Sequence, residues 1–129
     1  MKEVIEWFKK VPKVERFMPF LVYKGKVYTP SDIVELAKQN KLPDDLKKKV
    51  LSHQFTTIID KYIIGIERVR KVLKNLQSKG DIQIAIGGKI YTPEQLLKEV
   101  ERGTKIGRML VEAEIDKWEI LWKKKKENK

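Results

Sequence analysis

Two stretches of the chain, 63 residues apart, carry nearly the same amino-acid pattern. The first reads YKGKVYTPSDIVELAKQN from Tyr23, and the second reads IGGKIYTPEQLLKEVERG from Ile86. Such self-similarity constrains the fold before any other feature does, because two copies of one unit predict a pseudo-symmetric domain. We place the repeats at 17–63 and 80–126, within a single domain that spans all 129 residues.

Each copy predicts a β-hairpin followed by an α-helix. Short β-prone runs flank Lys24-Gly25 in the first copy and Gly87-Gly88 in the second, and glycine accepts the positive φ of a two-residue turn. The Thr-Pro pair that follows marks a helix start, with threonine as the N-cap and proline at the first helical position. If the two hairpins join side by side, they form a four-stranded antiparallel sheet. The pattern therefore predicts an α+β fold with four short antiparallel strands.

The segment 43–80, between the two hairpins, predicts one long helix or two nearly continuous ones. The segment 104–126 predicts a C-terminal helix. The long helix carries apolar residues at the 4-3 spacing of a heptad seam, and a second apolar stripe indicates that it also packs within its own domain. We predict a homo-oligomer, most simply a dimer, through a coiled-coil seam made of Phe55, Ile59, Tyr62, Ile66, Val69, Leu73 and Leu76, together with Trp118 and Trp122.

The composition and the motifs exclude several kinds of chemistry. The chain has no cysteine and only one histidine, His53, so disulfides, thiolate metal sites and histidine-rich metal sites are ruled out. Lys89 follows two glycines but precedes isoleucine, so it does not belong to a phosphate-binding P-loop. We predict a protein that is not an enzyme and has no cofactor, no metal and no small-molecule substrate. Acid–base catalysis by a carboxylate pair such as Glu112 and Asp116 stays an open alternative.

The apolar runs predict a soluble, cytoplasmic protein. They are far shorter than the ~20 residues that a membrane span needs, and charges interrupt the apolar stretch at the N-terminus. We therefore expect neither a signal peptide nor a membrane contact. The abundance of Lys, Glu, Ile and Val is typical of thermophiles, so we expect a thermophilic and archaeal source.

The formal net charge of +11 favours a nucleic-acid partner, because a positive surface attracts the phosphate backbone. Alternation along the strands places tyrosines and lysines on one face of the hairpins, and aromatic rings beside lysines can stack on unpaired bases. That face can equally be half-covered by helices, and the charge can serve solubility alone. We predict binding of nucleic acid, with single-stranded DNA favoured, by Tyr23, Lys24, Lys26, Tyr28, Lys89, Tyr91, Lys47, Lys48, Lys49, Arg68, Arg70, Lys71 and Lys74.

Two β-hairpins with helices, a heptad-bearing helix for dimerisation and basic edges resemble the architecture of the archaeal single-stranded DNA-binding proteins called ThermoDBP. The resemblance implies a cleft in which bases contact aromatic and apolar side chains while basic edges hold the backbone. It carries over no functional positions, because it concerns architecture and no residue motif.

A second hypothesis is an interaction or assembly protein, such as a component of a mobile element, a virus particle or a filament. In that case the hydrophobic helices make the contacts and the basic charge is incidental. This hypothesis predicts dispersed lysines and self-association that is insensitive to nucleic acid.

Overall fold

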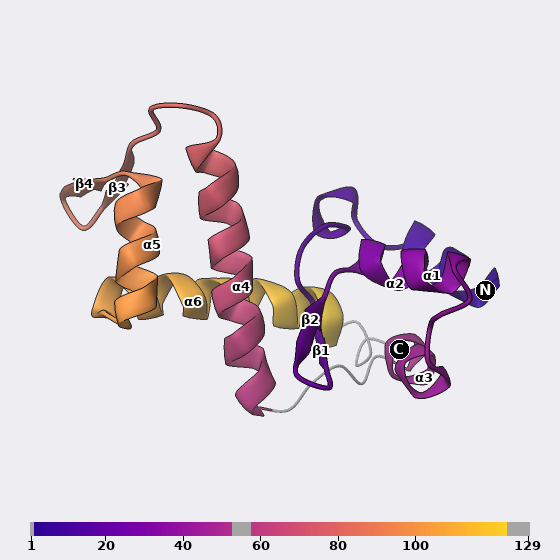
Figure 1. Ribbon diagram of the computed structural model, residues 1–129. Coiled ribbons are helices and arrows are strands. Elements are labelled where there is room, and N and C mark those ends of the chain that lie inside the picture. The colour runs from indigo at the N-terminus through magenta and orange to yellow at the C-terminus, as the bar shows by residue number, and fades with distance from the viewer. Residues whose placement is uncertain (1, 53–57, 124–129) are drawn as a thin grey trace.

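The computed structural model describes residues 2–52 and 58–123. Within these ranges the chain forms six α-helices and two antiparallel β-hairpins, each followed by a helix, so the predicted α+β class is confirmed (Figure 1). The elements in chain order are α1 (Lys2–Lys9), a 3-10 turn η1 (Lys13–Glu15), β1 (Leu21–Tyr23), β2 (Lys26–Tyr28), α2 (Pro30–Lys38), α3 (Asp44–Leu51), α4 (Ile58–Gln77), β3 (Ile84–Ile86), β4 (Lys89–Tyr91), α5 (Pro93–Arg102), α6 (Lys105–Trp118) and a π-helical turn η2 (Glu119–Lys123).

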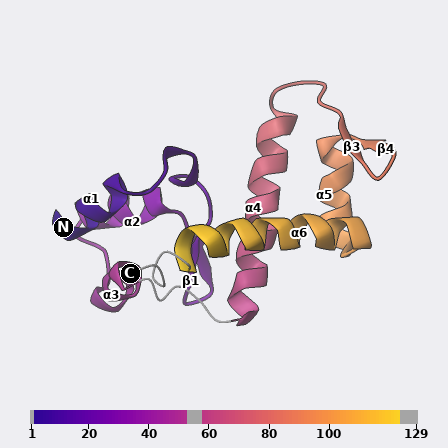
Figure 2. The ribbon, with the colours of Figure 1, turned by 180° about the vertical axis from the view of Figure 1, so that it is seen from behind.

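The two hairpins stay separate, so the four-stranded sheet is not formed. Leu21 pairs with Tyr28 in the first hairpin, and Ile84 pairs with Tyr91 in the second. Figures 1 and 2 place the second hairpin beside α5 at one end of the molecule, while the first lies among the helices of the N-terminal half. The 20 residues of α4 carry the chain about 30 Å between them, which keeps the strand edges apart.

The same backbone conformations recur 63 residues apart. The hairpin turns Lys24-Gly25 and Gly87-Gly88 have positive φ throughout, and so do Asn40 just after α2 and Gly103 at the end of α5. Helix α1 precedes the first hairpin as α4 precedes the second, and two helices follow each hairpin. The described chain is therefore two units of helix, hairpin, helix and helix.

Threonine begins α2 and α5 in the same way. The hydroxyl of Thr29 accepts a hydrogen bond from the N–H of Asp32 (3.1 Å), and the Asp32 carboxylate accepts one from the N–H of Thr29 (2.9 Å). Thr92 and Gln95 form the same reciprocal pair in the second unit. These bonds satisfy backbone donors that the helix leaves unpaired, which explains the Tyr-Thr-Pro motif as a strand-to-helix junction.

The segment predicted as one long helix or two nearly continuous ones contains two helices, α3 and α4, which pack on different elements. Helix α3 packs on α1, whereas α4 packs on α5 and α6. None of the helices in the described ranges is both long and apolar enough to span a membrane.

Apolar side chains gather into two clusters, one around the first hairpin and one around α5. The first cluster contains Val4, Trp7, Val11, Phe20, Leu21, Val22, Ile33, Val34, Ala37, Leu46, Val50, Ile64, Trp118 and Trp122. The second contains Val69, Leu73, Leu96, Val100, Val111 and Ile115. Helix α6 contributes to both clusters, because it crosses α4 and ends beside the first hairpin (Figure 2). Helix α4 also contributes to both, with Ile64 in the first cluster and Val69 and Leu73 in the second, so two helices cross the boundary between the units.

Four of the residues predicted for the oligomer seam are buried within the chain. Val69 and Leu73 are buried in the second cluster, and Trp118 and Trp122 are buried in the first. The prediction that these four residues meet a second copy is wrong, because α5, α6 and the N-terminal unit already cover them. Close contact with α6 also explains Gly65, since a Cβ there would lie 2.6 Å from Cγ1 of Ile115.

The rest of the predicted seam is less enclosed. Ile66 is half-buried against the second cluster, Leu76 is half-buried, and Tyr62 is 43% exposed. Phe55 and the side chain of Ile59 lie outside the described residues. Oligomerisation itself stays a prediction, without Val69, Leu73, Trp118 and Trp122 as contact residues.

Candidate nucleic-acid interface

One hydrogen-bonded contact brings the first hairpin and α3 together. The hydroxyl of Tyr23, at the end of β1, donates to both carboxylate oxygens of Asp45, at 2.8 and 2.9 Å. Asp45 lies in the first turn of α3, where an acidic residue is favoured by the helix dipole. We call the predicted binding residues on the two elements that this contact joins the first-hairpin surface: Tyr23, Lys24, Lys26, Tyr28, Lys47, Lys48 and Lys49.

Two lysines of this surface lie over tyrosine rings. The ammonium of Lys24 is 5.4 Å from the ring centre of Tyr23, and that of Lys26 is 5.3 Å from the ring centre of Tyr28. The two rings meet edge to face, 6.4 Å apart, and both pack against the first cluster. The tyrosines therefore position the lysines and offer only partly exposed rings for base stacking. This arrangement matches the half-covered face that the sequence left as an alternative.

The lysines of the first-hairpin surface differ in their exposure and in their ion pairs. Lys24, Lys26 and Lys48 are exposed, whereas Lys49 is half-buried. Lys47 forms an ion pair with Glu3 at 3.0 Å, and the hydrogen bond from Lys47 lowers the pKa of Glu3. Lys24, Lys26 and Lys48 are thus the exposed cations of this surface, and Lys24 is also attracted to the Asp45 carboxylate.

The contact between Tyr23 and Asp45 shifts the pKa of both groups. The hydrogen bond from Tyr23 lowers the pKa of the Asp45 carboxyl, and its bond to Asp45 raises the pKa of the Tyr23 hydroxyl. The contact requires ionised Asp45 and protonated Tyr23. Its stabilising effect is therefore complete between their unfolded pKa values, about 3.9 and about 10.

We expect the stability difference between the wild type and Tyr23→Phe to depend on pH. At pH 7 the variant is less stable because it lacks the bond to Asp45. The difference persists down to about pH 4, the unfolded pKa of Asp45, and is lost as the pH falls further through the lowered folded pKa. Urea unfolding between pH 2 and 7 measures it. Tyr28→Phe is the matched control, and an identical pH dependence in that variant would contradict the assignment.

Arg68 does not belong to a nucleic-acid surface, so its prediction as a binding residue is wrong. It is 1% exposed, and its guanidinium donates to both oxygens of Glu15, at 2.7 and 2.9 Å, and to Glu114 at 3.1 Å. Burial opposes its charge, but the hydrogen bonds to Glu15 and the attraction of both carboxylates raise the pKa of Arg68. Arg68 therefore joins η1, α4 and α6 through buried hydrogen bonds.

The remaining predicted residues lie away from the first-hairpin surface. Arg70 pairs with Glu67 on α4 at 2.9 Å, while Lys71 and Lys74 are exposed on the same helix. Exposed Lys89 and half-buried Tyr91 belong to the second hairpin, at the other end of the molecule, where Tyr91 packs against the second cluster (Figure 1). The structure therefore divides the predicted site into three separate parts.

Reasoning from the sequence missed one aromatic residue. Phe17 is 62% exposed, more than any other aromatic side chain in the described ranges. It lies on the turn before β1, outside the tyrosine-bearing strands that alternation singled out. Its basic neighbours Lys13 and Arg16 are the sequence signal that points to it.

Comparisons with known proteins give this chain no relatives. It matches no protein-family model, no curated protein and no solved structure. Residues 2–52 and 58–123 also contain no cluster of His, Cys, Asp and Glu side chains that could hold a metal ion. His53 lies outside these ranges.

Proposed function

We propose that this protein is a non-enzymatic nucleic-acid-binding protein that contacts the phosphate backbone through the first-hairpin surface. The observation that carries the proposal is the Tyr23–Asp45 contact, which holds a lysine-bearing hairpin against a lysine-rich helix. Fixing exposed cations from two elements on one surface suits a polyanion, because each neutralised phosphate releases counterions. Single-stranded DNA stays the favoured ligand.

The comparison of the two repeats supports this location. Residues 21–51 carry seven Lys and Arg against four Asp and Glu, whereas the matching residues 84–114 carry five against five. The lysines 47–49 correspond to Leu110, Val111 and Glu112 in the second unit. Two units with the same backbone plan thus differ in charge, and the excess of positive charge lies in the unit with the aromatic-supported lysines.

The proposal is tested by removing the exposed cations of the first-hairpin surface. We expect the triple variant Lys24→Gln, Lys26→Gln, Lys48→Gln to bind a labelled single-stranded oligonucleotide more weakly than the wild type. The slope of log K against log salt should decrease in magnitude by about 0.7 for each phosphate that the variant no longer neutralises. Fluorescence anisotropy across a salt series measures both quantities.

The matched control removes three positive charges from the second unit, with Lys98→Gln, Arg102→Gln and Lys105→Gln. All three side chains are exposed, so the net charge changes equally without touching the first-hairpin surface. An equal loss of affinity in the two triple variants would contradict this surface as the site. Absence of binding by the wild type to both single strands and duplexes would overturn the function itself.

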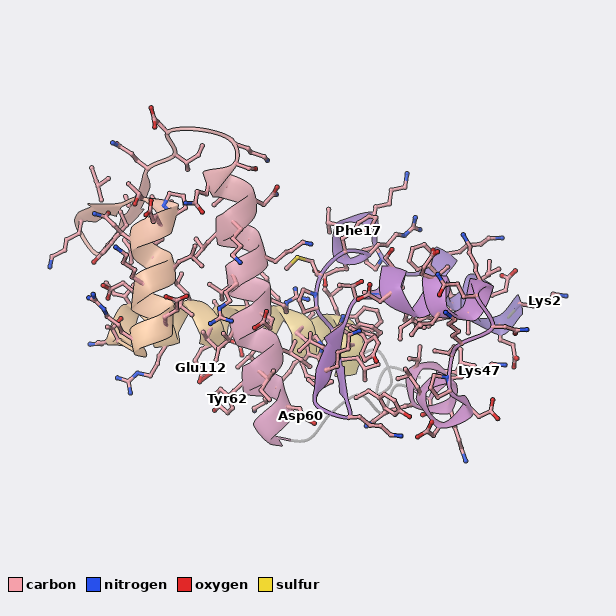
Figure 3. All side chains as sticks on the ribbon, in the orientation of Figure 1. Lys2, Phe17, Lys47, Asp60, Tyr62 and Glu112 are labelled. Carbon is pink, nitrogen blue, oxygen red and sulfur yellow. The ribbon has the colours of Figure 1, made fainter. Side chains whose placement is uncertain are left out.

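One observation favours the alternative, an interaction or assembly protein. A largely apolar groove of about 310 Å³ lies between α4, the end of α5 and α6. Two of its lining residues, Tyr62 and Glu112, are labelled in Figure 3. Its lining is Tyr62, Ile66, Val100, Gly103, Gly107, Arg108, Val111 and Glu112. Self-association that Tyr62→Ala abolishes and that nucleic acid leaves unchanged would favour this second function.

A further inference from the structure

The turn before the first hairpin presents two apolar side chains to solvent. Val14 is 82% exposed and Phe17 is 62% exposed, and Figure 3 shows Phe17 on the outer side of this turn. Scattered apolar residues are common on protein surfaces and need no explanation by themselves. Val14 and Phe17 differ from such scattered residues because buried contacts fix the backbone that carries them.

Glu15, between the two exposed residues, points inward and is 7% exposed. Both of its carboxylate oxygens accept hydrogen bonds from Arg68, and Arg68 also donates to the carbonyl of Pro19 at 3.3 Å. Charge-assisted, two-pronged pairs of this kind are the most geometrically specific hydrogen bonds available to a protein. The turn is therefore held at Glu15 and at Pro19, on both sides of Phe17.

Arg16 holds the same turn through contacts with α1, with the residues after it and with the start of α2. Its Nε donates to the carbonyl of Val11 at 3.2 Å, and its guanidinium lies 4.7 Å from the ring centre of Phe8. Its own carbonyl accepts a hydrogen bond from the N–H of Ser31 at the start of α2 (2.9 Å). A ring exposed on a backbone already held in place loses little further conformational entropy when it binds.

The charges around Phe17 indicate what it meets. Lys13 is exposed in the same turn, and Lys10 is exposed just after α1. Lys71 is also exposed, one helical turn after Arg68, whose guanidinium bonds to Glu15 of the turn. An exposed aromatic face among cations fits an unpaired base, whose ring stacks while its phosphates pair with the lysines.

We propose that Phe17 is a base-stacking residue for single-stranded nucleic acid, with Lys13 and Lys71 as its phosphate contacts. This inference rests on the proposed function and adds a second contact point to it. The turn enters β1 through Pro19 and Phe20, so Phe17 precedes the three-residue strand and the Lys24-Gly25 tip follows it. In the second unit the position matching Phe17 is Gly80, so the ring occurs in the basic unit only.

The test compares Phe17→Leu, Phe17→Trp and Val14→Ala by fluorescence anisotropy, with a labelled oligothymidine and a labelled duplex. We expect Phe17→Leu to weaken binding of the single strand by about 5- to 150-fold, the range for loss of one base–aromatic stack, and to change duplex binding less than twofold. Phe17→Trp and Val14→Ala are expected to bind the single strand as the wild type does. Thermal unfolding checks that each variant is folded, since both positions are exposed.

A second readout follows the stack directly. Trp7, Trp118 and Trp122 are at most 8% exposed, so Phe17→Trp adds the one strongly exposed indole among the described positions. We expect oligothymidine to quench the additional fluorescence and to protect it from iodide. Quenching at the concentrations at which anisotropy rises would support stacking.

The failures of the two proposals are distinguishable. If Phe17→Leu binds like the wild type while the triple variant of Lys24, Lys26 and Lys48 binds weakly, the stacking proposal is overturned and the proposed function stands. If Phe17→Leu and Val14→Ala both change the sedimentation coefficient without nucleic acid, the turn is a protein contact and the proposal is wrong. If the wild type binds no oligonucleotide, both proposals fail together.

Discussion

Replacing Arg68 with methionine is expected to destabilise the fold by about 3–5 kcal/mol. The Arg68 side chain is 1% exposed and pairs with both Glu15 and Glu114, which are 7% and 8% exposed. Methionine fills a similar volume but leaves two buried carboxylates without their arginine, and Lys117, 3.3 Å from Glu114, compensates for only one of them. Urea unfolding followed by circular dichroism measures the change.

The matched control for Arg68→Met is Arg70→Met on the same helix. Arg70 and Glu67 form an ion pair in which both side chains are more than a third exposed, so the expected change is about 0–1 kcal/mol. The variant Arg68→Met, Glu15→Gln, Glu114→Gln removes the buried charges together and should recover part of the loss. Equal effects of Arg68→Met and Arg70→Met would show that the buried network does not stabilise the fold.

Replacing Trp118 with alanine is expected to cost about 3–5 kcal/mol. Trp118 is completely buried at the end of α6, and its indole N–H donates to the carbonyl of Phe20 at 2.8 Å. It belongs to the first cluster although its helix also builds the second, so its removal opens a large cavity where the two units meet. The free energy of unfolding, measured in urea, tests this expectation.

Trp118→Phe separates the two contributions of the indole. Phenylalanine keeps most of the buried ring but leaves the carbonyl of Phe20 without its donor, which should cost about 1–3 kcal/mol. Ile120→Ala is the control for the same stretch of chain, because Ile120 is 61% exposed and its truncation should change stability by about 0.5 kcal/mol or less. Comparable losses in Trp118→Ala and Ile120→Ala would contradict the role of Trp118 at this boundary.

The local features of the fold were predictable because each depends on residues close together in the chain. Glycine at the hairpin turns and Thr-Pro at the helix starts act within four residues, and the structure has positive φ and reciprocal capping bonds at these positions. Of the candidate site, the sequence selected the lysines and tyrosines of the first-hairpin surface. It did not predict that Tyr23 would bond to Asp45, which lies 22 residues further on.

What the sequence determined by itself is therefore the repeated unit, its turns, its caps and its positive charge. Only the tertiary structure decided which apolar stripe is covered and which charge is buried. Val69 and Leu73 of the heptad seam are covered in the second cluster, which α5 and α6 also build, and Arg68 meets Glu15 across 53 residues of chain. Burial depends on contacts between distant segments, and periodicity within one helix does not specify which segment will cover it. Contacts between distant segments also explain the exposure of Phe17. Glu15, two residues before it, turns inward to Arg68 on α4, and Phe17 faces outward.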